Sequence, residues 1–281
     1  MLGARPEQCK ELVFHSNRAK STKMTLDPIQ KASREQFERH SANYGKSHIL
    51  ANTADVASAL ADVHVLPGSR ALDVATGGGH TAIFLATRGF AVTASDISQA
   101  MLDSAKSLAA ERGLSIDTRL HEAEKFPYST GSYDLVTCRV AAHHFSSREA
   151  FLAEVARVLK PGGYFLLIDG SIPDDEPIAE EWIHELEKLR DPSHCRFLSP
   201  GRWKELCDRY QLQVVRCETT PFKQPDLNWY FDTAGTPAEN RKRVLELIHT
   251  APESARRVFR IGEEDGKIIW WWTRLSLLAQ K

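Results

Sequence analysis

The sequence predicts an α/β fold in which a doubly wound, parallel β-sheet carries helices on both faces. Short apolar segments of strand length alternate along the chain with segments of helical periodicity, the order of repeated strand–helix–strand units. Three consecutive glycines at 77–79 follow the first such strand and open a helix. A Pro-Gly-Gly sequence at 161–163 ends a later helix directly before another strand. The alternation of strands and helices predicts that successive strands lie parallel.

The predicted elements follow one another in a regular order. A helix at 53–63 precedes the first strand, and a helix at 81–88 follows the glycine turn. Ser98 is expected to cap the next helix, and apolar residues at helical spacing predict another one over 151–159. The predicted strands lie at 71–74, 91–95, 116–120, 135–138, 164–168, 213–217 and 267–278. A long polar and helical insert separates the last two strands.

Length, charge and cysteine content limit the classes of protein that fit this sequence. The 281 residues suit one large α/β domain, which we expect at 24–281 after a disordered, basic extension at 1–23. The formal net charge is −1, so a broad electrostatic surface for nucleic acid is not expected. The five cysteines are scattered without metal-ligand spacing, which favours reduced thiols over disulfides or a metal site. Apolar segments fall short of membrane-spanning length, so we expect a cytoplasmic protein, monomeric or homodimeric, with no nucleic-acid or membrane partner.

An acid in the first strand is the unusual feature of the glycine turn. Asp73 stands four residues before Gly77, where a strand buried on both faces is normally apolar. Gly77 and Gly79 let backbone N–H groups approach a ligand without a Cβ in the way. An acid at that place fits a ligand with a positive charge, such as the amino group of S-adenosylmethionine. The turn therefore favours an aminoacyl-nucleoside pocket over a pyrophosphate pocket.

A second acid ends the next strand. Asp96 follows the glycine turn by about twenty residues, the spacing of a carboxylate that accepts from both ribose hydroxyls. The structural alternatives are a tight turn alone for the glycines and a helix N-terminal charge for Asp96. In sheets of this kind, ligands bind outside the carboxyl ends of the strands. That rule also selects Ala75, Ile97, residues 121–124, Arg139, His143 and His144.

Four segments, in this order and spacing, carry a family resemblance: LDVATGGGHTAIFLA, VTASDISQAMLDSAK, HEAEKFPYSTGSYDLVTCRVAAHHF and EVARVLKPGGYFLLID. They resemble the class I S-adenosylmethionine-dependent methyltransferases, and within them the methyltransferase type 11 group that includes the ubiquinone and menaquinone C-methyltransferases. The resemblance covers about residues 37–170. It implies S-adenosyl-L-methionine as cofactor and a Rossmann-like seven-stranded sheet, mostly parallel with an antiparallel final strand. It also implies helical substrate cover, expected near 28–50, 171–200 and 219–266.

The resemblance implies roles for particular residues. In the family, the acid after the third strand accepts from the adenine amino group and its neighbour's N–H donates to the ring, and Glu122 and Ala123 match those positions. Glu122 replaces the commoner Asp, so Glu124 stays an alternative. Ala75 stands where many members have glycine, so the turn depends on Gly77 and Gly79. The cofactor-binding candidates are Asp73, Ala75, Gly77, Gly79, Asp96, Ile97, Met101, Glu122, Ala123 and Arg139.

The catalytic candidates are His143, His144 and Tyr44. The two histidines follow the strand at 135–138, where a small-molecule methyl acceptor would meet the sulfonium, and histidine can take a proton near neutral pH. The alternative is that one packs beneath the following helix while the other is exposed. Tyr44 lies in a segment that in the family folds over the cofactor. Methyl transfer is an in-line displacement, which requires alignment of acceptor, carbon and sulfur and no metal.

Aromatic residues in the expected cover segments indicate the acceptor class. They favour a flat or apolar small molecule, such as a quinone, phenol or polyketide-like ring, with ordinary packing as an equal alternative. They are Trp182, Phe197, Phe222, Trp229, Tyr230 and Phe231. The three tryptophans at 270–272 are expected in core or interface positions. The predicted function is therefore C- or O-methylation of such a molecule.

Three other functions stay open at this point. Gly77 and Gly79, followed by Ala82, satisfy a loose dinucleotide pattern, which allows a nicotinamide-dependent oxidoreductase, although Asp73 argues against it. The near-neutral charge gives little support to a nucleic-acid methyltransferase. A protein of this fold can also bind the cofactor without methyl transfer, as a cyclase or an interaction module. Turnover to S-adenosylhomocysteine separates that case from an enzyme.

Overall fold

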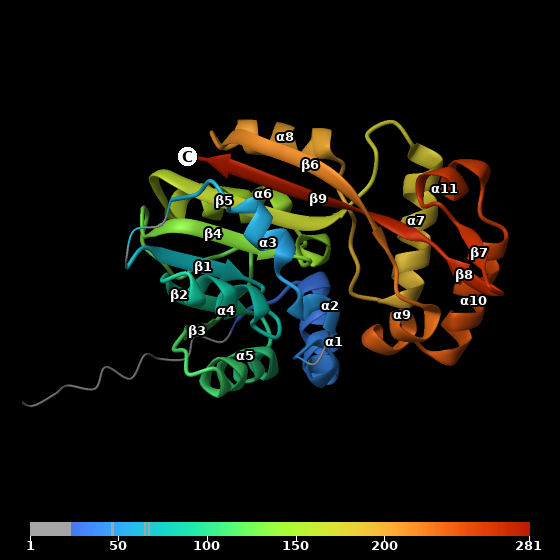
Figure 1. Ribbon diagram of the computed structural model, residues 1–281, viewed down its shortest axis with the longest axis horizontal. Coiled ribbons are helices and arrows are strands. Elements are labelled where there is room, and N and C mark those ends of the chain that lie inside the picture. Colours follow the sequence, from blue (N-terminus) through green and yellow to red (C-terminus); the bar gives the residue numbers. More distant parts are fainter. Residues whose placement is uncertain (1–23, 46–47, 65, 67) are drawn as a thin grey trace, which may run out of the picture.

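The computed structural model describes residues 24–45, 48–64, 66 and 68–281, with the backbone alone at 42–45 and 48. The extension expected at 1–23 lies outside the described residues. Seven strands form the central sheet: β1 (Arg70–Val74), β2 (Ala91–Asp96), β3 (Asp117–Leu120), β4 (Tyr133–Arg139), β5 (Leu159–Ser171), β6 (Gln213–Lys223) and β9 (Trp271–Gln280). Their order across the sheet is β3–β2–β1–β4–β5–β9–β6 (Figure 1).

One strand of this sheet runs against the others. The pairs from β3 to β5 are parallel, whereas β9 is antiparallel to both β5 and β6. This confirms the predicted mostly parallel sheet with an antiparallel final strand. The direction in which successive strands are added reverses between β1 and β4, and the carboxyl ends of the strands beside such a switch point form a crevice.

Helices cover both faces of the sheet. α3 (Ala54–Ala59) and α4 (His80–Thr87) pack with Ala71 on one face, and α6 (Arg148–Val158) and α8 (Pro200–Arg209) pack with Leu72 and Val74 on the other. Alternation of side chains along β1 therefore supplies both layers. α5 (Gln99–Glu111) follows β2, and the Ser98 hydroxyl accepts from Met101 N at its start, as the sequence predicts.

A helical lobe lies beside the sheet, on the right in Figure 1. It consists of α7 (Pro177–Arg190), α9 (Leu227–Ala234), α10 (Ala238–His249), α11 (Glu253–Val258) and the hairpin of β7 (Gly262–Glu264) and β8 (Lys267–Ile269). Trp182, Tyr230, Phe259 and Trp270 are buried in its own apolar core. α1 (Pro28–Gly45), which precedes α2 (His48–Ala51), contacts both α5 and α9 and so touches both parts of the molecule.

Two elements differ from the prediction. The helix expected at 53–63 ends at Ala59. The strand expected at 267–278 breaks at Trp270, because this side chain is buried in the lobe's core, so that β8 pairs with β7 while β9 joins the sheet. The helical cover expected near 28–50 is divided between α1 and α2. Asp27 and Gln30 form a reciprocal cap at the start of α1, in which each side chain accepts the other's backbone N–H.

Candidate active site

A cavity opens at the carboxyl ends of β1, β2 and β4, where sheets of this type bind ligands. It encloses about 1290 Å³, its open mouth included. The predicted site residues on its wall are Ala75, Gly77, Asp96, Ile97, Met101, Ala123, Arg139, His143 and His144. Asp73, Gly79 and Glu122 are not part of the wall. The side chain of Tyr44 lies outside the described residues.

Left-handed backbone shapes the strand ends that face the cavity. Ala75 and Val140, directly after β1 and β4, have φ values of 53° and 54°. Such conformations cost non-glycine residues about 1–3 kcal/mol each and concentrate at functional sites. Gly77 adopts φ 53° at no such cost, and a Cβ added to it would meet nothing within 4 Å, because it would project into open space.

Gly79 has a different role from Gly77. Its φ is 84°, and an added Cβ would lie 2.6 Å from Ala105 Cβ on α5. The turn therefore packs against α5 at this position. Gly79 supports the site from outside the wall, and its contact with the cofactor stays a prediction.

Asp73 lies beneath the turn. It is 1% exposed, and its two oxygens accept from the hydroxyls of Thr76 and Thr137 at 2.6 Å each. Burial raises the pKa of this carboxyl to about 6. The two threonines orient it, and it ties β1 to β4 and to the turn. Contact of Asp73 with the cofactor's amino group stays a prediction.

Asp96 joins the turn to the second strand. Its Oδ2 accepts from Gly77 N and its Oδ1 from Ser98 N, both at 2.9 Å. Burial raises its pKa to about 6, although these N–H groups oppose the shift. Each oxygen keeps a second lone pair, so the carboxylate can accept further donors on the cavity side, where Ile97 and Met101 flank it. These are the acceptors that the two hydroxyls of a ribose diol require as donors.

The wall after β3 differs from the expectation for Glu122. His121, Ala123 and Glu124 line the cavity. Glu124 accepts from Gln30 Nε2 at 2.9 Å and from Ser146 N at 2.8 Å, so it joins α1 to the loop after β4. Glu124, the alternative, is thus the acid on the wall. Glu122 offers its carbonyl oxygen to His121 Nδ1 instead.

Arg139 ties the end of β4 to the segment before β1. Its guanidinium pairs with Asp55 at 3.0 Å and donates to the carbonyl oxygens of Leu50 and Asn52. Arg274 on β9 reaches the same carboxylate at 3.3 Å. Arg139 therefore lines the cavity with a cation whose three nitrogens each already donate one hydrogen bond.

The two histidines lie side by side in the short helix η1 (Ala142–His144), with ring centroids 4.1 Å apart. Both line the cavity and both are buried. His143 Nδ1 lies 2.6 Å from Asp169 Oδ1. His144 Nδ1 lies 3.1 Å from the hydroxyl of Ser193, which in turn donates to Asp191 at 2.6 Å. Each imidazole is therefore linked to an acid, directly for His143 and through Ser193 for His144. The alternative arrangement, with one ring packed and the other exposed, differs from this structure, in which both rings are buried.

Sequence reasoning missed these partners. Asp169 lies one residue beyond the strand predicted at 164–168, so the rule that selects acids at carboxyl ends of strands would have selected it had the end of β5 been known. Asp191 and Ser193 follow α7, and the pattern of the sequence contains no signal that brings them to η1.

The far end of the cavity is aromatic and charged. Residues from all three predicted cover segments lie on its wall, among them Phe37, Asp191 and Trp229. Trp272, expected in a core or interface, also lines it, and Arg190 lies beside it, 5.7 Å from the centre of its ring. That these segments close over an acceptor stays a prediction.

Ordinary packing accounts for most of the other cover aromatics. These side chains form part of the lobe's core: Trp182, Phe197, Tyr230 and Phe231. Phe222 lies on β6, where the Arg274 guanidinium is 3.9 Å from its ring centre. Of the six aromatics named from the sequence, Trp229 is thus the one on the cavity wall.

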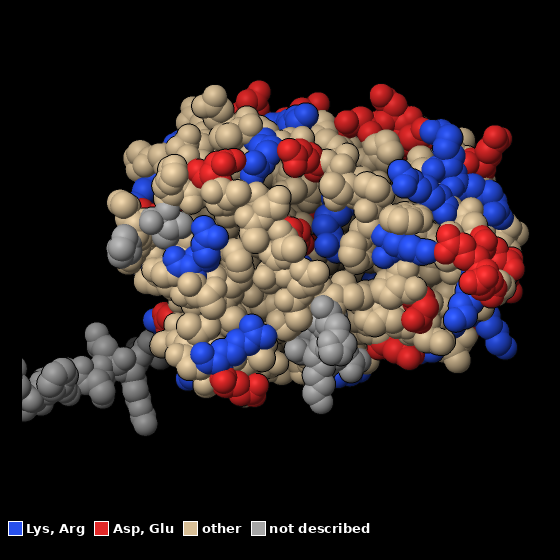
Figure 2. All heavy atoms as spheres, in the orientation of Figure 1, with Lys and Arg blue, Asp and Glu red and all other residues tan. Residues whose placement is uncertain are grey.

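Three further observations concern the described residues. On the face shown in Figure 2, acidic and basic side chains are interspersed rather than gathered by sign. Every helix in the described part of the chain is too short or too polar to cross a lipid bilayer. Within the same residues, His, Cys, Asp and Glu side chains form no group that could hold a metal ion.

Comparisons with known proteins identify the family. A family model described as a methyltransferase domain matches residues 72–167. The methyltransferase YcgJ of Bacillus subtilis is 32% identical over 228 residues, which are 80% of this chain and 88% of YcgJ. The crystal structure of YcgJ has a TM-score of 0.75 at 30% identity and covers 82% of this chain and 99% of its own.

Two further matches extend the comparison. A ubiquinone/menaquinone biosynthesis C-methyltransferase of Paraburkholderia phymatum is 31% identical over 156 residues, 52% of this chain and 64% of that protein. The structure of geranyl diphosphate C-methyltransferase from Streptomyces coelicolor, which contains S-adenosyl-L-homocysteine, covers 90% of this chain and 98% of its own with a TM-score of 0.62. At 16% identity it shows the shared fold alone. Because YcgJ matches along most of both chains, this protein belongs to the class I methyltransferases, enzymes that use S-adenosylmethionine as cofactor.

Proposed function

We propose that the protein transfers the methyl group of S-adenosylmethionine to a carbon or oxygen of a small aromatic or apolar molecule. One observation carries the proposal. A single cavity extends from Gly77 and Asp96 at the sheet to His143, Trp229 and Trp272 at the helical lobe. A nucleoside cofactor and a second small molecule can therefore lie in it end to end.

The residues at the ends of β1 and β2 fit the cofactor. Asp96 would accept from the ribose hydroxyls, and the open space beside Gly77 leaves room for the amino-acid part of the cofactor against the backbone. Ile97, Met101 and Ala123 offer an apolar surface for the adenine ring. When bound there, the cofactor supplies a methyl group on an electrophilic sulfonium.

The residues at the other end of the cavity would bind the acceptor and take up its proton. Phe37, Trp229 and Trp272 offer flat apolar surface, which favours a ring or another apolar molecule over a strongly hydrated one. His143 and His144 are 7% and 8% exposed, so a proton taken up there is largely shielded from bulk water. A histidine in this position would accept the acceptor's proton before or during attack. The names of the quinone-biosynthesis relatives support a ring-shaped acceptor.

Calorimetry followed by turnover tests the function. Titration with S-adenosylhomocysteine is expected to show binding, with NADH as the control that tests the oxidoreductase alternative. Purified protein is then incubated with S-adenosylmethionine and a panel of phenols, quinols and polyketide-like rings, and formation of S-adenosylhomocysteine is measured. A matched panel of sugars, amines and short RNA serves as the control.

Each outcome decides between the alternatives. Release of S-adenosylhomocysteine with an aromatic acceptor supports the proposal. Turnover with the polar panel alone overturns the acceptor class. Binding of S-adenosylhomocysteine without turnover on any acceptor would favour a cofactor-binding protein that transfers no methyl group.

A further inference from the structure

Asp169, near the end of β5, holds the ring of His143 in one orientation. Its Oδ1 lies 2.6 Å from His143 Nδ1, and its Oδ2 accepts the backbone N–H of the same histidine at 2.9 Å. Oδ1 also accepts from Gly170 N at 2.8 Å. Because both oxygens of Asp169 already accept N–H groups, Nδ1 is the donor in its contact with the carboxylate. Neutral His143 therefore carries no proton on the opposite nitrogen, Nε2.

The hydrogen bonds around His144 also place the proton of the neutral ring on Nδ1. A serine hydroxyl has one proton, and that of Ser193 goes to Asp191 Oδ1 at 2.6 Å. Ser193 Oγ therefore accepts from His144 Nδ1 at 3.1 Å. Burial favours a higher pKa for Asp191, but His144 and Ser193 hold it below its usual range, so Asp191 stays an acceptor. Burial and His143 lower the pKa of His144 to about 4, which leaves one ring proton at neutral pH.

In the neutral rings the two Nε2 atoms are consequently lone-pair acceptors. Within the described residues, the hydrogen bonds of both rings run through Nδ1. Both rings lie on the cavity wall, 4.1 Å apart between centroids. The charged or titratable groups packed around the pair are Asp169 on β5, His184, Glu187 and Arg190 on α7, and Asp191 and His194 in the segment after α7.

The segment that carries Asp191 and Ser193 is fixed to the histidines. The backbone N–H groups of Cys195 and Arg196 both donate to the carbonyl oxygen of His143, at 2.8 and 3.1 Å. The chain therefore returns to η1 from the helical lobe at the two histidines. Ser193 lies between these bonds and α7, so its hydroxyl is not free to leave the His144 ring.

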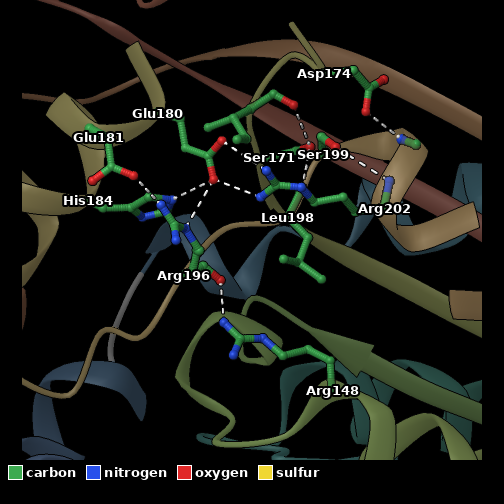
Figure 3. Close-up of polar contacts among 12 residues, drawn as sticks. Arg148, Ser171, Asp174, Glu180, Glu181, His184, Arg196, Leu198, Ser199 and Arg202 are labelled. Atoms are coloured by element: carbon green, nitrogen blue, oxygen red, sulfur yellow. Dashed lines mark hydrogen bonds and ion pairs between the residues drawn. The ribbon is translucent and has the colours of Figure 1, made fainter. Parts of the chain in front are cut away.

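An ion-pair cluster around the carboxylate of Glu180 holds the other side of this segment (Figure 3). The carboxylate of Glu180 on α7 pairs with Arg196 at 3.0 Å and with Arg202 on α8 at 2.7 Å. Arg148 on α6 donates to the carbonyl oxygen of Arg196 at 2.8 Å. Helices from both parts of the molecule thus clamp the residues that follow Ser193, and the acid–serine pair keeps its place beside His144.

We propose, on the basis of the function proposed above, that Asp169 and the Asp191–Ser193 pair are positioning residues that fix both histidines as Nδ1–H tautomers. Both Nε2 atoms then face the methyl acceptor without a proton, ready to accept from its O–H or acidic C–H group. The proton moves from the acceptor to Nε2 and the new positive charge is stabilised by the acid on the Nδ1 side. An electron pair of the acceptor forms the new bond to the methyl carbon, and the bond between sulfur and that carbon breaks with its electron pair left on sulfur, which becomes the neutral thioether of S-adenosylhomocysteine.

Two-bond ¹H–¹⁵N correlation spectra of histidine-labelled protein, with S-adenosylhomocysteine bound, test the tautomers without any acceptor. We expect His143 and His144 each to show a protonated Nδ1 and an unprotonated Nε2. Assignment uses His143→Gln and His144→Gln. An Nε2–H tautomer in either histidine of the unmodified protein overturns the proposal for that histidine. The readout is independent of the acceptor, so a failed acceptor screen and a failed tautomer assignment are distinguishable.

Three variants test what sets the tautomers. Asp169→Asn is expected to convert His143 toward the Nε2–H form, and Ser193→Ala to do so for His144 alone. Ser171→Ala is the matched control, because its hydroxyl is as buried as that of Ser193 but donates to Leu198 O outside the cavity. It is expected to change neither histidine. Unchanged tautomers in both test variants would show that these residues do not position the rings.

Kinetics with an acceptor found in the screen add a second readout. For Asp169→Asn we expect kcat to fall about 10²-fold or more while KM changes by less than about threefold, because proton acceptance is lost and binding is kept. Retained affinity for S-adenosylhomocysteine shows that each variant is folded. A rise in KM with unchanged kcat would mean that Asp169 serves acceptor binding, which overturns its assignment as a positioning residue for proton transfer.

Discussion

The two ends of the cavity are built in different ways. The end proposed to bind the cofactor, called the cofactor end, is formed by residues close together in the sequence, Gly77, Asp96 and Met101, and its polar contacts run through the backbone of one turn. The end proposed to bind the acceptor, called the acceptor end, gathers His143, with Trp229 from α9 and Trp272 from β9, from elements far apart in the chain. It presents side chains rather than backbone.

This difference predicts how each end responds to substitution. At the cofactor end a changed side chain alters the turn itself, so affinity and folding stability change together. At the acceptor end one side chain can be replaced while the sheet and its turn stay as they are. Substitutions that separate stability, cofactor affinity and acceptor turnover would therefore test whether the two ends are independent.

The largest expected effect is on stability at the cofactor end. Gly79→Ala places a Cβ 2.6 Å from Ala105 Cβ and 2.9 Å from its Cα, in a residue with φ 84°. Left-handed strain and overpacking together are expected to lower the free energy of unfolding by about 2–4 kcal/mol. Urea denaturation followed by circular dichroism measures the loss.

Gly77→Ala is the matched control for this substitution. Its φ is also left-handed, at 53°, but its added Cβ meets nothing within 4 Å. We expect a loss of about 1–2 kcal/mol from strain alone, together with weaker binding of S-adenosylhomocysteine, because the methyl group projects into the space beside the wall. Equal losses of stability in the two variants would contradict the close packing of the turn on α5.

The cofactor end was predictable because its signals are local. Asp73, the glycine turn and Asp96 mark strand ends within one strand–helix–strand unit, and the structure forms that unit where the sequence predicts it. The open choice between Glu122 and Glu124 is also local. A loop of four residues does not specify which acid faces inward, and Glu124 does so through its bonds to Gln30 and Ser146.

The acceptor end could not be predicted in the same way. Trp270 and Trp272 lie two residues apart, yet one is buried in the lobe's core and the other lines the cavity, because the strand breaks between β8 and β9. Ser193 reaches His144 only through the packing of α7 and η1. Such contacts depend on tertiary packing, to which hydrophobic periodicity gives no guide.

The next largest expected effect is on binding, and it differs between the two ends. Asp96→Ala is expected to weaken S-adenosylhomocysteine binding by about 1–3 kcal/mol, because two hydrogen bonds to a charged acceptor are lost. Trp229→Ala is expected to leave that affinity within about twofold and to raise KM for the acceptor, since it removes contact surface at the other end alone. Calorimetry and steady-state kinetics give the two numbers.

Asp103→Ala controls for the loss of an acid near the same helix. Asp103 is exposed on α5 and accepts from Gln99, away from the wall. Its replacement should change neither affinity nor KM. A loss of cofactor affinity in Trp229→Ala as large as that in Asp96→Ala would mean that the two ends are coupled through α1 and α9, and the comparison would fail.

The smallest expected effect is a pH dependence confined to the cofactor end. Burial raises the pKa of Asp96 to about 6, above its unfolded value of about 3.9, so folding favours the protonated carboxyl between these values. This group alone would stabilise the fold as pH falls through 6, whereas acids with lowered pKa values, such as Asp134 and Glu154, act in the opposite direction. The pH dependence of cofactor affinity therefore reports on the Asp96 carboxyl more directly than the pH dependence of folding stability does.

Ionised Asp96 is the stronger acceptor for ribose hydroxyls, so S-adenosylhomocysteine binding should weaken as the carboxyl takes up a proton. With a pKa of about 6, a site that binds only in the ionised form loses about tenfold in affinity between pH 7 and pH 5. Asp73 also has a raised pKa of about 6, so Asp96→Asn is needed to separate them. If the loss persists in Asp96→Asn, it belongs to Asp73 and to the shape of the turn; if it disappears, the cavity's pH response resides in the carboxylate that closes the turn.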